Sequence, residues 1–339
     1  MKEAILYKKL SNGAVQCQVC NHRCTINKGC RGTCSVRENI DGTLFALTYR
    51  KVISEAVDPV EKKPLFHFLP GSSTLSIATL GCNFRCDNCQ NWQISQQPKT
   101  ENKNIIGDDI APNQIISHAL SQKCKSISYT YTEPTVFIEY ALETMKLAHD
   151  SGLKNIWVSN GFMSTETLEL IIPYLDAINI DLKYFDNKSY QKYCGGKLDP
   201  ILKNLITLKK SGVWVEITTL VIPGISDDQS MFNQIAEFIF TKLGPETPWH
   251  ISRFSPGISF KLIDSQPTPT TSLEKALNIG IKHGLKYVYV GNTPGHKSEN
   301  TYCPLCRSLN IDRLGVRINR YDDQGRCYKC KKSLNIINK

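Results

Sequence analysis

The sequence from Thr79 to Cys89 reads Thr-Leu-Gly-Cys-Asn-Phe-Arg-Cys-Asp-Asn-Cys and directly follows Leu75–Leu80, an apolar run that predicts a strand. Its cysteines Cys82, Cys86 and Cys89 have the spacing C-x3-C-x2-C. Three thiolates on one tight loop suit three irons of a cubic 4Fe-4S cluster and leave the fourth iron open. A zinc site or a chance cluster is the alternative, but zinc would need a fourth protein ligand, and none is obvious in the loop.

Strand and helix patterns alternate along the chain after this loop. Alternation of this kind implies a parallel sheet with right-handed crossovers. We therefore expect an α/β fold with a partial, TIM-like (β/α)6-type barrel over residues 71–295, whose active site lies at the carboxyl ends of the strands. The predicted strands are Leu75–Leu80, Ser126–Tyr131, Asn155–Ser159, Asp176–Asp181, Val213–Val221, His250–Phe254 and Leu285–Val290, and the predicted helices are Pro112–Lys123, Thr135–Asp150, Thr165–Tyr174, Pro200–Ser211, Gln229–Leu243 and Ser272–His283.

Cysteine pairs also mark the C-terminal tail, residues 296–339. Two C-x2-C pairs twenty residues apart are typical of a zinc ribbon, in which two tight turns offer four thiolates in a tetrahedron. We expect a structural zinc that folds a tail too short to have a core of its own. The predicted ligands are Cys303, Cys306, Cys327 and Cys330.

The N-terminal region, residues 1–70, is cysteine-rich and then extended. Cys17, Cys20 and Cys24 have the spacing C-x2-C-x3-C, and either Cys30 or Cys34 is the fourth ligand. We prefer Cys34. The spacing leaves the metal open between zinc and an auxiliary iron–sulfur cluster.

Composition places the chain in the cytosol. No run of about 18 apolar residues indicates a transmembrane helix, and the N-terminus lacks the apolar region and cleavage site of a signal peptide. Twelve of the fourteen cysteines fall in the three clusters, and clustered cysteines in a reducing compartment indicate metal ligands or catalytic thiols.

The net charge of +10 is unevenly distributed. Residues 1–60 carry 9 basic and 5 acidic groups, and residues 296–339 carry 10 and 4, whereas the middle of the chain is neutral. Such a basic excess can attract nucleic acid. We prefer local compensation of metal-bound thiolates, so nucleic acid is not an expected partner, although an RNA-binding or RNA-modifying protein remains an alternative.

The Cys82–Cys89 loop resembles the cluster-binding loop of the radical SAM superfamily. The resemblance implies that S-adenosylmethionine chelates the open iron and that one electron cleaves it to a 5′-deoxyadenosyl radical, which abstracts hydrogen from a substrate. Members usually have an aromatic residue before the third cysteine, near the adenine. This chain has Asn88 at that position.

Polar residues after the next three strands also fit this resemblance. Glu133 is implied to bind the methionyl amino group, although a Glu in the first turn of a helix is an alternative. Ser159 and Asn160 match positions that meet the ribose or carboxylate, although Asn160-Gly161 also favours a turn. Asp181 and Lys183 resemble the Asp-x-Lys of activating-enzyme barrels, with a plain ion pair as the alternative.

Two further residues, His250 and Arg253, are candidates for a catalytic role in the substrate pocket. A histidine in a half-buried strand is also commonly structural. Cys194 and Cys124 stand outside the clusters, and we expect both to be buried, inert thiols, with hydrogen-atom donation by Cys194 as the less favoured possibility.

Longer strings of sequence resemble the radical SAM member of the AmmeMemoRadiSam system. They are the Cys17–Cys34 cluster, Asp58–His67, Gly81–Trp92, Trp249–Pro256 and Tyr289–Thr293. This family is similar to pyruvate formate-lyase activating enzymes. The resemblance implies Memo and AMMECR family partners and an electron donor of the flavodoxin or ferredoxin type, and it leaves a glycyl-radical activating enzyme as an alternative.

Overall fold

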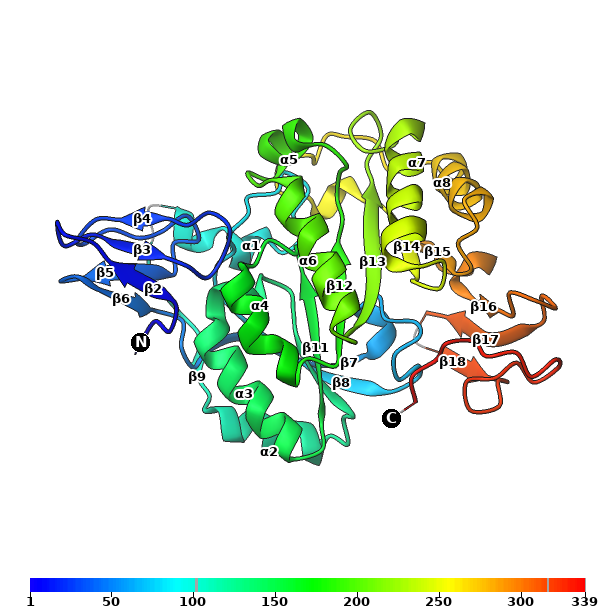
Figure 1. Cartoon of the computed structure of the whole chain (residues 1–339), viewed down its shortest axis with the longest axis horizontal. Helices are drawn as coiled ribbons and strands as arrows, with labels where there is room; N and C mark the ends of the chain where they lie inside the picture. Colours follow the sequence, from blue (N-terminus) through cyan, green and yellow to red (C-terminus); the bar gives the residue numbers. More distant parts are fainter. Residues whose placement is uncertain (101–102, 316, 339) are drawn as a thin grey trace.

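A nine-stranded sheet forms the centre of the computed structural model, which describes residues 1–100, 103–315 and 317–338 (Figure 1). Seven neighbouring strands run parallel, and β7 and β9 add two antiparallel strands at one edge. This arrangement confirms the predicted α/β fold. In spatial order the strands are β15 (Val288–Gly291), β14 (Trp249–Arg253), β13 (Trp214–Val221), β12 (Ala177–Asp181), β11 (Lys154–Ser159), β10 (Ser126–Tyr129), β8 (Ser73–Thr79), β7 (Lys51–Pro59) and β9 (Asp108–Asp109).

Helices connect the parallel strands, as the alternating pattern predicts. Three of the predicted helices are irregular at one end, and the helix predicted at Thr165–Tyr174 ends in a 3-10 turn, Ile172–Tyr174. The segment before α3 forms a 3-10 turn, Pro134–Phe137, and α7 ends in a π-helical turn, Ile239–Leu243. The helices are α1 (Trp92–Ser95), α2 (Pro112–Ser121), α3 (Ile138–Asp150), α4 (Thr165–Ile171), α5 (Asn187–Tyr193), α6 (Leu198–Lys210), α7 (Gln229–Phe238) and α8 (Thr270–Lys282). No helix in the described ranges combines the length and apolar character needed to cross a membrane.

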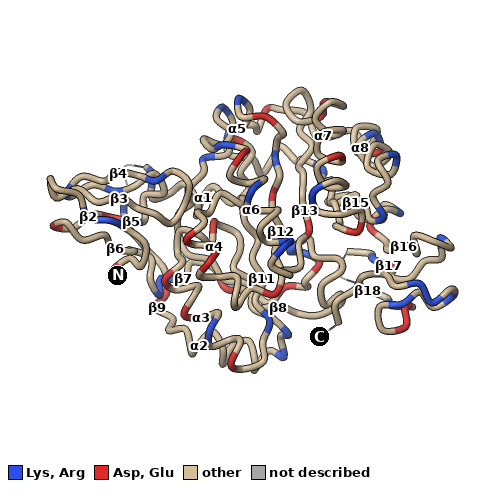
Figure 2. Tube along the Cα trace, viewed as in Figure 1, with Lys and Arg blue, Asp and Glu red and all other residues tan. Residues whose placement is uncertain are grey.

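Small antiparallel sheets lie at the two ends of the long axis (Figure 1). The N-terminal segment forms two of them, and the C-terminal tail forms the third. Basic residues are frequent in the tail, as Figure 2 shows around β17 and β18. The three sheets comprise β1 (Lys2–Glu3), β6 (Thr43–Ala46) and β5 (Arg37–Ile40); β2 (Tyr7–Lys9), β3 (Val15–Cys17) and β4 (Thr25–Ile26); and β16 (Thr301–Tyr302), β17 (Leu309–Leu314) and β18 (Arg317–Arg320).

Asp58 organises a buried polar network where β7 meets β8 and β10. Its carboxylate accepts hydrogen bonds from Lys62 and Lys63 at 2.7 Å each, from Ser76 Oγ at 2.8 Å, and from the Tyr131 hydroxyl. Lys63 is 1% exposed, so this ion pair is shielded from solvent. Although burial acts in the opposite direction, these donors lower the pKa of Asp58 below its ordinary range. The network fixes the end of β10, from which Glu133 follows.

Glu216 organises a second buried network below the middle of the sheet. Its carboxylate accepts hydrogen bonds from the backbone N–H groups of Phe66 and His67 at 2.9 Å each, and it lies 2.7 Å from His250 Nε2. The His67 ring then reaches the C-terminal tail, because its Nδ1 lies 3.0 Å from the Leu334 carbonyl oxygen. The segment from Asp58 to His67 therefore joins the edge of the central sheet to the tail.

Candidate active site and cysteine clusters

The Cys82–Cys89 loop begins directly at the carboxyl end of β8 and leads into α1. Gly81 makes this turn possible. Its φ of +95° lies in the left-handed region, and a Cβ there would come within 2.5 Å of Val36 Cγ1. Only glycine tolerates both conditions, so the loop packs closely against the N-terminal segment.

The three thiols of this loop do not converge as ligands of a single ion would. In the part of the chain that the structure describes, only the C-terminal cysteines bring three or more ligand atoms within 4.8 Å of one another. Two thiolates on one tetrahedral zinc are about 3.8 Å apart, given a Zn–S distance of about 2.3 Å. A cubic cluster instead binds each thiolate through a different iron. The donor set of Cys82, Cys86 and Cys89 therefore fits the cluster better than zinc.

Burial holds these thiols in the neutral form. It raises the pKa of Cys82 and Cys89, and a hydrogen bond with Cys194, followed by burial, raises the pKa of Cys86. The positive charge of Lys99 acts in the opposite direction at Cys82. Metal binding at this loop must therefore release protons.

Glu133 joins the carboxyl ends of β10 and β11. Its Oε1 accepts hydrogen bonds from Thr135 N at 3.1 Å, from Thr135 Oγ1 at 2.5 Å and from Ser159 Oγ at 2.8 Å, and its Oε2 accepts one from Asn160 N at 2.9 Å. Glu133 is 2% exposed, and burial raises the pKa of its carboxyl group. The structure thus brings Glu133, Ser159 and Asn160 together, and it also makes Glu133 the cap of the following 3-10 turn.

Asn160 connects this network to the cysteine loop. Its Nδ2 donates to Asn83 Oδ1 at 2.7 Å and lies 4.0 Å from Cys82 Sγ. Asn83 is 1% exposed, and its backbone carbonyl oxygen accepts from His22 Nε2 at 2.8 Å. Within the described part of the chain, its Nδ2 has no hydrogen-bond partner. The carboxyl edge of the sheet beside Cys82 therefore has a buried amide donor that is free to bind an acceptor on a ligand.

Asp181 and Lys183 form an ion pair at the end of β12, with Lys183 Nζ 2.7 Å from Asp181 Oδ2. Although burial acts in the opposite direction, the Asp181 carboxylate raises the pKa of Lys183 well above its ordinary value. The same lysine interacts electrostatically with Cys86 and Cys194. The pair thus places a permanent cation beside the central triad.

The remaining predicted site residues lie in different settings. Asn88 is half-buried within the cysteine loop. Arg253 ends β14 at the carboxyl edge, and its Nε is buried without a partner. His250 lies near the opposite, amino end of β14, 1% exposed against Glu216, and its ring contacts Phe66 at a centroid distance of 4.7 Å. His250 is therefore buried, hydrogen-bonded to Glu216 and packed against Phe66.

Three residues near the triad escaped the sequence analysis, namely Asn83, His22 and Lys99. Lys99 Nζ donates to the Phe84 carbonyl oxygen at 2.6 Å, inside the cysteine loop. Asn83 stands within the quoted motif, so its position was the available signal. His22 and Lys99 carry no such signal, because only the folded chain brings them to the loop.

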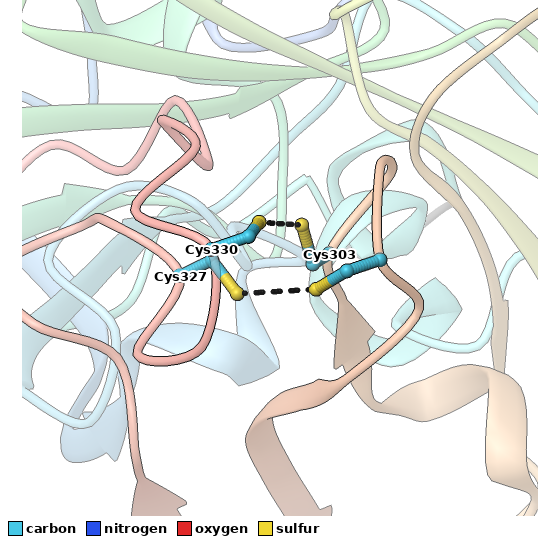
Figure 3. Close-up of side chains that lie close together, drawn as sticks. Cys303, Cys327 and Cys330 are labelled. Atoms are coloured by element: carbon cyan, nitrogen blue, oxygen red, sulfur yellow. Dashed lines mark hydrogen bonds between the residues drawn. The ribbon is translucent and has the colours of Figure 1, made fainter.

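The C-terminal cysteines form a tetrahedral group, as Figure 3 shows for Cys303, Cys327 and Cys330. The Sγ atoms of Cys303 and Cys330 are 3.5 Å apart, as are those of Cys306 and Cys327. Although desolvation acts in the opposite direction, hydrogen bonds, foremost that with the Ser308 hydroxyl, lower the pKa of Cys327 to about 5. Although a backbone hydrogen bond with Lys332 acts in the opposite direction, desolvation and hydrogen bonds with the other three thiols raise the pKa of Cys330 to about 12. The four ligand atoms all lie within 4.8 Å of one another, so they fit a single metal ion, and its binding must release protons.

The N-terminal cysteines are arranged differently. Cys17, Cys20, Cys24 and Cys34 line one small cavity that is partly open to solvent. Cys30 is exposed and is not among the residues that line it. Burial raises the pKa of Cys17 to about 11 and also raises that of Cys34.

Comparisons with known proteins agree with this geometry. The family model described as the Radical SAM superfamily matches residues 76–239. An uncharacterized protein of Methanocaldococcus jannaschii is 44% identical over 99% of this chain and 100% of its own length. The (2S)-3-sulfopropanediol dehydratase activating enzyme of Klebsiella oxytoca is 29% identical over 33% of this chain and 35% of its own length. A radical SAM methyltransferase structure from Sphaerobacter thermophilus shares the fold, with a TM-score of 0.50 and 10% identity over 65% of this chain and 66% of the other.

Proposed function

Because the chain belongs to the radical SAM superfamily, we propose that it is an enzyme that cleaves S-adenosylmethionine reductively at the Cys82–Cys89 loop and abstracts hydrogen from a substrate. When bound, the cluster and S-adenosylmethionine supply the 5′-deoxyadenosyl radical. The observation that carries this proposal is the wide spacing of three thiols at the carboxyl edge of the sheet, beside the Glu133 network.

The roles of the chain's own residues follow from their positions. Cys82, Cys86 and Cys89 bind three irons and leave the fourth for S-adenosylmethionine. Glu133 Oε2 accepts one hydrogen bond, from Asn160 N, so it retains acceptor capacity for an ammonium group. Asn83 Nδ2 is a buried donor suited to a carboxylate.

Residues at neighbouring strand ends position the rest of the ligand. The Lys183–Asp181 pair lies beside Cys86, where the lysine offsets the charge of the thiolates. Asn88 and Ser159 face the expected adenosine side of the site in this proposal, and Arg253 binds substrate at the end of β14. His250 positions Glu216 and the strands around it rather than contacting substrate.

The proposal also includes an electron donor, protein partners, a second metal and a cellular location. We propose a one-electron donor of the flavodoxin or ferredoxin type, partners of the Memo and AMMECR families, and zinc at the C-terminal cysteines. None of the fourteen cysteines, all within the described residues, forms a disulfide. This supports a cytoplasmic location, where thiols stay reduced.

The test is anaerobic. The protein is reconstituted with iron and sulfide, reduced, and given S-adenosylmethionine, and 5′-deoxyadenosine is quantified beside a Cys86→Ala variant and a Cys30→Ser control. The wild type and Cys30→Ser should form 5′-deoxyadenosine, and Cys86→Ala should not. Equal formation by Cys86→Ala would exclude the central loop as the site.

A second candidate function is activation of a glycyl-radical enzyme, in which the substrate is a backbone glycine of another protein. It is favoured by the similarity to the Klebsiella oxytoca activating enzyme over 33% of this chain. Incubation of the reduced protein and S-adenosylmethionine with a glycyl-radical protein should then produce a glycyl signal in electron paramagnetic resonance. Formation of 5′-deoxyadenosine without that signal would count against this candidate.

A further inference from the structure

The four N-terminal cysteines line a cavity, and their sulfur atoms do not converge on one point. Cys17 ends β3, Cys20 and Cys24 lie on the loop to β4, and Cys34 precedes β5, so three separate segments surround one cavity. Cys17, Cys20 and Cys34 are buried, and Cys24 is half-buried. These thiols belong to no group of three potential ligand atoms within 4.8 Å, among the residues that the structure describes.

This spacing differs from that of a single-ion site in the same molecule. The C-terminal thiols approach one another to 3.5 Å, near the about 3.8 Å expected for tetrahedral zinc. A zinc ion at the N-terminal cavity would require some of these thiols to move closer together. A cubic cluster needs a space between its ligands, because each thiolate binds a different corner.

The buried side chain of Arg37 is a second observation that indicates a ligand site at this cavity. Arg37 lines it and is 1% exposed, and Arg37 Nε and Nη1 have no hydrogen-bond partner among the residues that the structure describes. Only Nη2 is engaged, in the ion pair with Glu139. Two buried guanidinium donors without an acceptor are costly unless an anionic group accepts from them. A cluster with four thiolate ligands carries net negative charge and sulfur acceptors.

We propose that Cys17, Cys20, Cys24 and Cys34 bind a second 4Fe-4S cluster whose four irons all have protein ligands. Such a cluster has no open iron, so its chemistry is electron transfer and not binding of S-adenosylmethionine. The inference is separate from the proposed function, since it concerns only which cofactor this cavity holds.

The second cluster lies against the loop that holds the first. A Cβ on Gly81 would be 3.2 Å from the Cys34 carbonyl oxygen, so the two cysteine loops are in contact. His22, two residues after Cys20, reaches the carbonyl oxygen of Asn83, the neighbour of Cys82. An electron accepted at the N-terminal cluster thus has a short path to the central one, with one electron entering and one leaving.

The deciding experiment removes the central ligands. In a Cys82→Ala/Cys86→Ala/Cys89→Ala variant, anaerobic reconstitution should leave about four irons and four sulfides per chain and a cluster signal in electron paramagnetic resonance after reduction. A Cys20→Ser/Cys24→Ser variant should likewise retain about four irons, whereas Cys30→Ser should match the wild type at about eight. Absence of iron from the folded central variant would overturn the inference.

Metal analysis of the wild type needs no variant and decides independently. About eight irons and one zinc per chain support the second cluster, whereas about four irons and two zinc ions would show that the N-terminal cavity binds zinc. Failure of the proposed function gives a different pattern, in which eight irons are present but no 5′-deoxyadenosine forms with any partner.

Discussion

The two outer cysteine quartets use the same ligand type but hold it in different ways. At the C-terminus, two C-x2-C turns on a small sheet bring four sulfurs together around one point. At the N-terminus, four cysteines line a cavity together with the buried Arg37. Cysteine spacing alone predicted zinc at the C-terminus and left the N-terminal metal open between zinc and an iron–sulfur cluster. The two quartets therefore differ in how closely their sulfurs converge, and on this difference we base the proposal of a single ion at one and a cluster at the other.

We expect the largest effect when the C-terminal metal site is removed, because the tail depends on it for folding. The C-terminal sheet has only a small core of its own around the cysteines, so its order depends on the metal, and structural zinc contributes about 10–16 kcal/mol in zinc-finger peptides. Cys327→Ser should therefore unfold the tail while the central sheet keeps its structure. Hydrogen exchange followed by mass spectrometry checks this, with Cys30→Ser as the control. A tail that stays protected in Cys327→Ser would contradict the account.

The next prediction concerns the buried Arg37–Glu139 ion pair beside the N-terminal cavity. Arg37→Met leaves Glu139 as a buried, unpaired charge, so the free energy of unfolding should fall by about 3–5 kcal/mol. Arg31→Met is the matched control, because the Arg31–Glu38 pair is more exposed and should contribute about 1 kcal/mol or less. Denaturant unfolding of both variants is the measurement. Equal losses would mean that the Arg37 pair is not buried as described.

His67 links the tail to the central sheet and should make that link sensitive to acid. Burial lowers the pKa of His67 to about 4 from an ordinary 6.5, so the neutral ring is favoured in the folded protein. Stability is then full above pH 6.5 and falls by about 3 kcal/mol as the pH drops from 6.5 to 4. Unfolding of the wild type and His67→Gln across this range tests it, and an equal pH dependence in both proteins would rule out His67 as the cause.

The smallest effect is expected at the fifth N-terminal thiol. Cys30 is exposed and lies outside the residues that line the cavity. Cys30→Ser should change the free energy of unfolding by no more than about 0.5 kcal/mol and leave the iron content unchanged. Loss of iron from this variant would make Cys30, and not Cys34, the fourth ligand.

Much of the barrel was predictable, because parallel strands buried on both faces appear as short, continuous apolar runs. The observed strand Lys154–Ser159, for example, begins one residue before the predicted Asn155. The expectation that residues 1–70 form a separate segment did not anticipate that β7 pairs with β8 in the central sheet. Antiparallel pairing across a bulge leaves little pattern in a strand whose exposed and buried residues do not alternate cleanly.

The site was predictable where chemistry and chain order coincide. Three thiols on one loop, and Glu133, Ser159 and Asn160 at successive strand ends, lie close together because parallel strands share a carboxyl edge. The contact of His250 with Glu216 was not predictable, since it joins residues 34 positions apart on neighbouring strands. The same holds for Arg37 at the N-terminal cavity, whose role depends on what surrounds it.

The central claim is that the Cys82–Cys89 cluster binds S-adenosylmethionine through an open iron. The most direct measurement is electron paramagnetic resonance of the reduced Cys20→Ser/Cys24→Ser variant, in which only the central cluster remains, before and after addition of S-adenosylmethionine. The account predicts that the signal of this variant shifts, whereas the signal of the Cys82→Ala/Cys86→Ala/Cys89→Ala variant does not. An unchanged signal in the first variant would contradict it.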